Sequence, residues 1–156
     1  MATSAVPAAI DALLTVWRAL PGLAEVQVLD GPPTGDQSAA DYIAVGWQPE
    51  SNDLAAEALQ SFASAGARTR DEDFSIACWI DTWTGDTDVG ARRARAYELF
   101  ALIEDSLRAT GAAPQAPTLL GTVLFSQLSS SVLRQANTDQ GVRVGIAFTV
   151  ACRARI

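Results

Sequence analysis

The sequence predicts a single α+β domain in which a mainly antiparallel β-sheet packs against two α-helices. Residues 141–156 alternate strictly between apolar side chains and small or polar ones, which is the period of a strand with one buried face. Residues 4–20 and 88–110 instead place apolar side chains three or four positions apart, as amphipathic helices do. At 156 residues, 49% of them hydrophobic, the chain can form one core, so we expect one domain over residues 1–156.

The N-terminal third is expected to form a helix followed by two short strands. Ser4 can cap the helix over residues 4–20, because its hydroxyl can accept from the free backbone N–H groups of the first turn. Strands are predicted over residues 25–29 and 41–47. The Gly- and Pro-rich segment between them, about 31–40, is expected to be a flexible surface loop.

The middle of the chain is less regular. We expect a second flexible loop at about 48–56. Residues 54–64 combine helix propensity with a period-two pattern; we predict a strand over about 57–63, and a helix remains the alternative. The polar run that ends in Asp71–Asp73 is expected to be a solvated turn before a strand over 74–83.

The C-terminal half is predicted to contain the second helix and a closing hairpin. Thr84–Asp88 offers a cap for the helix over 88–110, and Gly111 follows its end. A long, bent strand over 122–134 then leads through the turn-rich residues 135–141 into the alternating final strand.

The composition argues against catalysis. The chain has no histidine, which removes the commonest general base and metal ligand. It has no Gly-rich phosphate loop, and its two cysteines, Cys78 and Cys152, are expected to be reduced core thiols, although a disulfide is possible. Asp86 and Asp88 are better explained as helix caps than as metal ligands. We therefore predict no enzyme activity, no cofactor and no metal.

The charge distribution limits the partners. The net charge is −7, and residues 1–77 hold eleven acidic side chains against three arginines. Such a chain should not bind DNA by neutralising phosphates, although it could line a passage through which DNA slides. No apolar run is long enough to cross a bilayer, and the N-terminus lacks a basic and apolar leader, so we expect a mature cytosolic protein.

Eight side chains are candidates for a subunit or partner interface. The arginines form the densest basic cluster on the second helix, the acidic residues could complement them, and tryptophan is enriched in interface anchors. Simpler roles are a solvated helix face, a solvated turn and buried packing, respectively. The candidates are Arg92, Arg93, Arg95, Asp71, Glu72, Asp73, Trp79 and Trp83.

The order and spacing of several segments resemble the tail terminator proteins of long-tailed, non-contractile phages, in the form found in phages of actinobacteria. The resemblance covers nearly the whole chain, and no segment in it is a catalytic signature. The segments that carry it are an N-terminal helix, then residues 26–32, 41–46, 66–76, 83–88 before the arginine-bearing helix, and 133–150.

This resemblance implies a virion structural protein that forms a ring, usually a hexamer. Such a ring caps the tail tube, stops its polymerisation and joins the tail to a head-completion or neck protein at the head-proximal end, while genomic DNA passes through the lumen. The protein would be assembled in the host cytoplasm, and it would have no membrane partner.

Three alternatives remain open on the sequence. A head-completion or neck protein could share the α+β plan and also form a ring. A small α+β domain could bind a ligand between its sheet and its helices. A tail tube subunit is the third alternative, but the two substantial helices make it less attractive.

Overall fold

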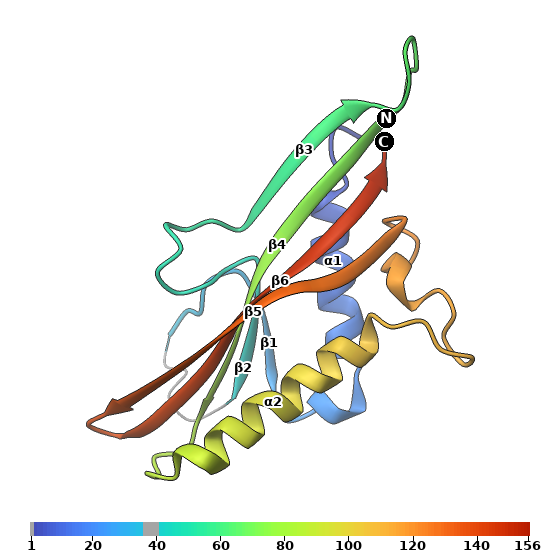
Figure 1. The fold of residues 1–156 in the computed structure, drawn as a ribbon. Coiled ribbons are helices and arrows are strands. Elements are labelled where there is room, and N and C mark those ends of the chain that lie inside the picture. The colour runs from blue at the N-terminus through green and yellow to red at the C-terminus, as the bar shows by residue number, and fades with distance from the viewer. Residues whose placement is uncertain (1, 36–40) are drawn as a thin grey trace.

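Six strands form one sheet in the described part of the chain, and two helices cover one face of it (Figure 1). This computed structural model describes residues 2–35 and 41–156. The α+β class, with a mostly antiparallel sheet and two helices, is confirmed. The elements are α1 (Val6–Arg18), η1 (Pro21–Leu23), β1 (Gln27–Asp30), β2 (Tyr42–Val45), β3 (Ala56–Phe62), β4 (Arg70–Trp83), α2 (Val89–Ser106), η2 (Ala116–Thr118), β5 (Phe125–Thr138) and β6 (Gly141–Arg155).

Strand β4 organises the sheet. The main strand order is β1-β2-β4-β6-β5, and only β1 and β2 are parallel to each other. On one side β4 pairs with β6 along nearly its whole length. On its other side β4 pairs first with β3, through Arg70–Ile76, and then with β2, through Cys78–Asp81. The sheet therefore ends at β5 on one edge and at β3 and β1 on the other.

The main core lies between the helices and the even-numbered side chains of β4 and β6. Trp17 of α1 and Phe100 of α2 both contact Phe148 of β6, with ring centroids 6.1 and 5.5 Å apart. Cys78 and Cys152 lie in this core as free thiols, as predicted. Full burial of one large apolar side chain stabilises a fold by about 1.5–3 kcal/mol, so this face of the sheet supplies most of the driving force.

The first helix begins at Val6, and its N-terminus is bound by a side chain from a distant strand. The Glu72 carboxylate accepts hydrogen bonds from the Ala5 backbone N–H (2.7 Å) and the Ser4 hydroxyl (2.6 Å). The predicted role of Ser4 is partly correct, because its hydroxyl also accepts from the Val6 N–H at 3.1 Å. A carboxylate near a helix N-terminus is favourable because it meets the positive end of the helix dipole.

The strand predicted over 57–63 is confirmed as β3, and the helix alternative is wrong. The turn predicted to end at Asp73 is also wrong there, because β4 begins at Arg70 and the turn occupies residues 63–69. Pairing with β3 on one side and β6 on the other extends β4 through these polar residues. Their alternation places Glu72 under α1 and leaves Asp71 and Asp73 on the opposite face.

The predicted hairpin is confirmed with shifted boundaries. β5 continues to Thr138, so the turn is Asp139-Gln140 instead of residues 135–141, because the alternating partner strand prolongs the ladder.

α2 ends at Ser106, before the expected Thr110. Asp88 caps it as predicted, accepting from the Ala91 N–H at 3.0 Å.

The two predicted loops are only partly described. Residues 31–35 and 48–55 form no helix or strand, whereas residues 36–40 of the first loop lie outside the described residues. Glu50, Asn52 and Asp53 in the second loop have positive φ angles of 64°, 52° and 62°. The flexibility of both loops stays a prediction.

Candidate assembly surface

The second face of the sheet carries no helix. Its centre is a small buried cluster of Tyr42, Ala44, Trp79 and Ala147, with Trp47 packed against it. Trp79 is 6% exposed, and its indole lies directly over Gly145, where an added Cβ would come 2.2 Å from the ring. Trp79, a candidate interface residue, therefore packs within its own chain.

A nearly buried carboxylate adjoins this cluster. Asp81, 5% exposed, accepts hydrogen bonds from Arg143 Nε (2.9 Å) and Trp79 Nε1 (3.3 Å). Burial, the charge of Asp81 and a hydrogen bond to Asp81 together raise the pKa of Tyr42 above its ordinary value. The arrangement neutralises one charge and fixes Trp79, which is a structural role.

The other arginines on this face are also paired with acids of the same face. Arg155 Nε lies 2.7 Å from Asp71, and Arg153 lies 3.7 Å from both Asp71 and Asp73. The hydrogen bond from Arg155 lowers the pKa of Asp71. Arg134 lies 3.3 Å from Glu50. Such exposed pairs stabilise the fold little. Their effect here is to cancel positive charge across the face.

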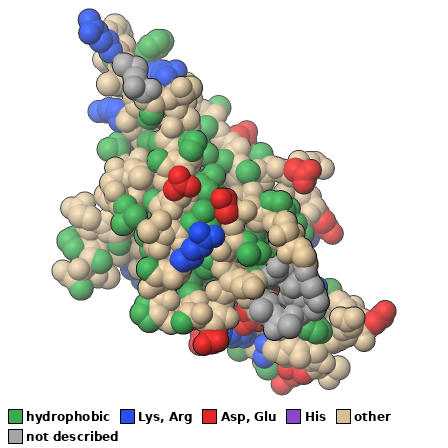
Figure 2. Space-filling view, turned by 180° about the vertical axis from the view of Figure 1, so that it is seen from behind, with side chains coloured by type: hydrophobic (Ala, Val, Ile, Leu, Met, Phe, Trp, Pro, Cys, Tyr) green, Lys and Arg blue, Asp and Glu red, His purple; other side chains and the backbone are tan. Residues whose placement is uncertain are grey.

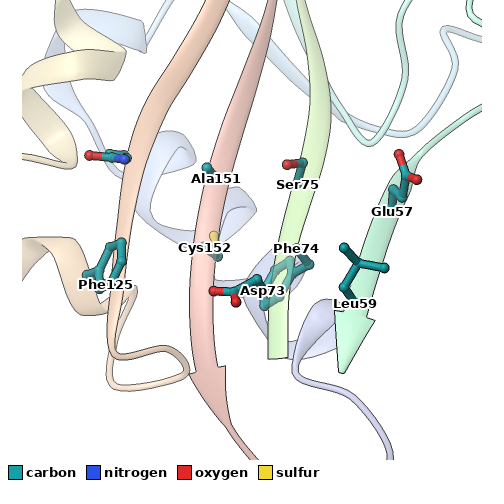
Figure 3. Close-up of a pocket in the computed structure, with 9 residues that line it drawn as sticks. Glu57, Leu59, Asp73, Phe74, Ser75, Phe125, Ala151 and Cys152 are labelled. Carbon is teal, nitrogen blue, oxygen red and sulfur yellow. The ribbon is translucent and has the colours of Figure 1, made fainter. Parts of the chain in front are cut away.

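Two shallow hollows mark the same face. One, of about 450 Å³, crosses β5, β6, β4 and β3 (Figure 3). Phe125 on β5 and Leu59 on β3 lie at its two sides, with Asp73 and Ser75 between them. The other, of about 430 Å³, adjoins Trp47 and Arg143. Both are open and wide, which suits a contact surface better than an enclosed ligand site.

The predicted arginine cluster lies at the start of α2, and its members point to different partners. Arg92 lies 3.7 Å from Asp86, and its Nε has no hydrogen-bond partner among the described residues. Arg93 donates to Gln135 of β5 at 2.9 Å. Arg95 pairs with Asp41 and Glu98, both at 3.0 Å. These residues thus connect α2 to neighbouring segments of the same chain.

The acidic candidates do not form a cluster. Glu72 is fully buried on the helix-covered face, where burial works against its charge but hydrogen bonds from Ala5, Ser4 and Gln60 outweigh it and lower its pKa. Asp71 and Asp73 face the other way, toward Arg155 and Arg153. The structure therefore does not bring the acidic residues and the α2 arginines together.

Trp83 lies at the far end of β4, half buried. Its Nε1 donates to the Gln140 carbonyl at 3.2 Å, and its ring lies 3.7 Å from the position of a Cβ on Gly85. Trp83 therefore fastens the β5–β6 turn to the segment that precedes α2.

The sequence prediction missed exposed hydrophobic side chains at the two sheet edges. Leu59 and Phe62 of β3 are 75% and 71% exposed, and Val132 of β5 is 54% exposed. Phe125 at the start of β5 and Leu124 just before it are also exposed. The signal was available, because β3 and β5 each contain a single charged residue, whereas edge strands usually carry charges or proline that prevent pairing.

Charged side chains are scattered on the face seen in Figure 2, except at its upper end, where arginines gather. This end carries the β3–β4 turn and both termini in Figure 1.

Over the described residues, no group of three or more His, Cys, Asp or Glu side chains could hold a metal ion. No helix in the same part of the chain has the length and apolarity needed to span a membrane.

Comparison with known proteins finds similarity in structure alone. No protein-family model matches the chain, and no curated protein matches it. Among solved structures, the fold is similar to a chain in a structure titled "Virion of native gene transfer agent (GTA) particle", with a TM-score of 0.59 and 14% sequence identity. The match covers 99% of this chain and 100% of that chain. The two chains therefore share one fold over their full lengths.

Proposed function

We propose that this protein is a structural component of a virion, and specifically a ring-forming tail terminator. The observation that carries the proposal is the full-length similarity of its fold to a chain from a gene transfer agent virion. The order and spacing of sequence segments that resemble tail terminators point in the same direction. In this proposal the protein acts by contact with copies of itself and with neighbouring virion proteins, and it catalyses no reaction.

The sheet edges support ring formation. β5 and β3 lie on opposite edges, and both present unpaired backbone groups and exposed hydrophobic side chains. A contact between two different patches repeats from copy to copy and closes into a ring at a suitable rotation. Strand edges that lack protective charges favour such contacts.

The charge pattern is compatible with a DNA passage. Each arginine on the uncovered sheet face lies within 4 Å of a carboxylate on the same face or its flanking loop. DNA binding grows with the number of phosphates that lysine and arginine neutralise. A face with paired arginines would let DNA move past without strong attachment. The partners in this proposal are a tail tube protein on one side of the ring and a neck protein on the other.

The proposal is tested by mass and by tail length. Native mass spectrometry of the purified protein should give a closed ring, with a hexamer expected. Tail tube protein polymerised in its presence should give tubes of limited length with the ring at one end, as seen by electron microscopy. A ring that captures a head portal complex and ignores the tail tube would support a neck protein instead, and a protein absent from purified particles would overturn the virion assignment.

A further inference from the structure

A third hollow lies away from the uncovered sheet face. It is a groove of about 740 Å³ between the C-terminal ends of α1 and α2 and the segment that leads to β5. Val16 of α1 and Leu20, two residues after this helix, form one side, and residues 112–116 and Leu120 form another. Asp105, near the end of α2, and Arg108, just after it, are the charged residues in its lining, and Arg108 pairs with Glu104 at 2.6 Å. The walls are mostly apolar, as in sites that receive a hydrophobic side chain.

The backbone beside this groove is held in an unusual conformation. Leu119, Leu120 and Gly121 have φ angles of 47°, 58° and 83°. A left-handed conformation is unfavourable for a residue other than glycine, and it persists where the surrounding structure imposes it. Leu119 is 1% exposed and anchors the turn in the core, whereas Leu120 is 68% exposed at the groove. The strained turn thus presents an apolar side chain to solvent.

A matching apolar side chain lies on the opposite edge of the sheet. Phe62, at the end of β3, is 71% exposed. It shares a strand face with Gln60, whose amide reaches Glu72 and the Thr3 carbonyl on the helix-covered side. Phe62 and the groove therefore belong to the same side of the sheet. The turn after Phe62 carries Arg68, which is exposed and makes no ion pair with the described residues.

The groove lies level with Ala58 of β3, four residues before Phe62. Ala58 of β3 pairs with Phe74, which pairs with Cys152, which pairs with Ser126 of β5. Ser126 in turn donates to the Pro117 carbonyl at 2.8 Å and so holds η2, part of the groove wall, beside β5. Figure 1 shows β3 and η2 at opposite edges of the sheet. A second copy displaced sideways, and by about 13 Å along the strands, would bring its Phe62 against the groove.

We propose that the groove receives Phe62 of a second copy of this chain, with Arg68 of that copy next to Asp105. The inference rests on the proposed function, for which it supplies the contact between neighbouring subunits. Copies with a net charge of −7 repel one another, so a stable contact needs local charge complementarity. Asp105 is exposed and makes no ion pair with a described residue, and Arg68 offers the opposite charge. An apolar anchor in a pocket, with charges at the rim, is typical of interfaces.

Cysteine cross-linking tests the contact. The double variant F62C/L120C is treated with a short bis-maleimide, and the products are resolved by denaturing electrophoresis. Cys78 and Cys152 are buried, and burial raises the pKa of each thiol to about 12, so the introduced thiols react first. We expect a ladder of covalent oligomers that ends at the ring size. The matched control F62C/Y97C carries its second thiol on an exposed site of α2 outside the groove and should stay largely monomeric.

The outcomes separate this inference from the proposed function. A ring in native mass spectrometry without the F62C/L120C ladder overturns the contact and leaves the terminator proposal intact. Cross-linking of F62C alone to the same extent indicates a symmetric contact and also overturns it. A charge swap gives a second readout: Arg68→Glu and Asp105→Arg should each lower the ring fraction at least about tenfold, and the double variant should recover it. Equal loss in the double variant would contradict the pairing of Arg68 with Asp105.

Discussion

At the scale of single residues, the buried carboxylate of Glu72 shows how a polar residue can be essential to a core. Three donors converge on this side chain: the Ser4 hydroxyl and the Ala5 backbone N–H, which both precede α1, and the Gln60 amide of β3. Hydrogen bonds to charged groups contribute about 1.5–3 kcal/mol each, and an unsatisfied buried group costs a similar amount. Glu72 therefore determines where α1 begins on the sheet.

Glu72→Gln should lower the free energy of unfolding by about 2 kcal/mol, because the amide removes the charge and turns one acceptor into a donor. Urea unfolding followed by circular dichroism measures the loss. Glu57→Gln on the exposed face of β3 is the matched control and should change stability by less than about 0.5 kcal/mol. Equal effects of the two substitutions would contradict the role assigned to Glu72.

The pH dependence of the same comparison has a defined sign. The folded pKa of Glu72 lies below its ordinary value of 4.5, so the unfolded chain binds the proton more tightly. The contribution of the carboxylate is fully present above about pH 4.5 and is lost as the pH falls through the lower, folded pKa. The stability difference between wild type and Glu72→Gln should therefore shrink below pH 4.5. A constant difference down to the acid-unfolding range would show that Glu72 is not the titrating group.

Gly145 is a second residue whose replacement has a defined consequence. A Cβ at this position would meet the Trp79 ring at 2.2 Å and the Ile80 carbonyl oxygen at 2.7 Å. Gly145→Ala should cost about 1–3 kcal/mol and change the tryptophan fluorescence, because the indole must move. Gly111→Ala, which meets no atom within 4 Å, should leave both unchanged. Normal fluorescence in Gly145→Ala would contradict the packing described here.

At the scale of elements, local sequence patterns predicted where strands and helices form better than they predicted the residues at which these elements begin and end. The alternation of residues 141–156 and the Asp88 cap are local properties, and both were predicted from the sequence. The start of β4 was missed because Asp71 and Asp73 are stabilised in a strand by ladder pairs with distant segments. The arginines of α2 were identified as a surface cluster, but their partners Asp41 and Gln135 are far away in the sequence and could not be inferred from spacing.

The cap of α2 gives a prediction at this scale. Asp88→Ala removes the acceptor for the Ala91 N–H and should lower the free energy of unfolding by about 1 kcal/mol. Asp88→Asn keeps the acceptor and should lose much less. Thermal unfolding of the two variants, compared at one pH, measures the difference. Equal losses would indicate that the charge matters and the hydrogen bond does not.

At the scale of the whole molecule, the two faces and the edges of the sheet carry different kinds of side chain. The helix-covered face holds the main core, whereas the uncovered face carries arginines that are each paired with acids. The edges carry the hydrophobic side chains that the core does not use. This distribution of side chains does not follow from composition, because a net charge of −7 could be placed on the surface in many ways. It depends on which strand face each charge occupies, and therefore on register.

The neutralised sheet face leads to a prediction about DNA. Asp71→Asn with Asp73→Asn removes the carboxylates that pair with Arg153 and Arg155 and leaves both guanidinium groups free. Because each newly available arginine can neutralise a phosphate, DNA affinity at low salt should rise by about tenfold and fall steeply as salt is added. Fluorescence anisotropy with a labelled duplex measures both.

The control for this experiment changes the net charge equally without freeing an arginine. Asp11→Asn with Glu25→Gln removes two negative charges from residues that form no ion pair with the described part of the chain. If overall charge decides DNA binding, both double variants should gain affinity alike. If the ion pairs on the uncovered face decide DNA binding, only the Asp71 and Asp73 variant should gain affinity. DNA passing through a ring of such subunits would then be retained. A wild-type protein that binds DNA as tightly as this variant would contradict the argument that these pairs keep the surface from holding DNA.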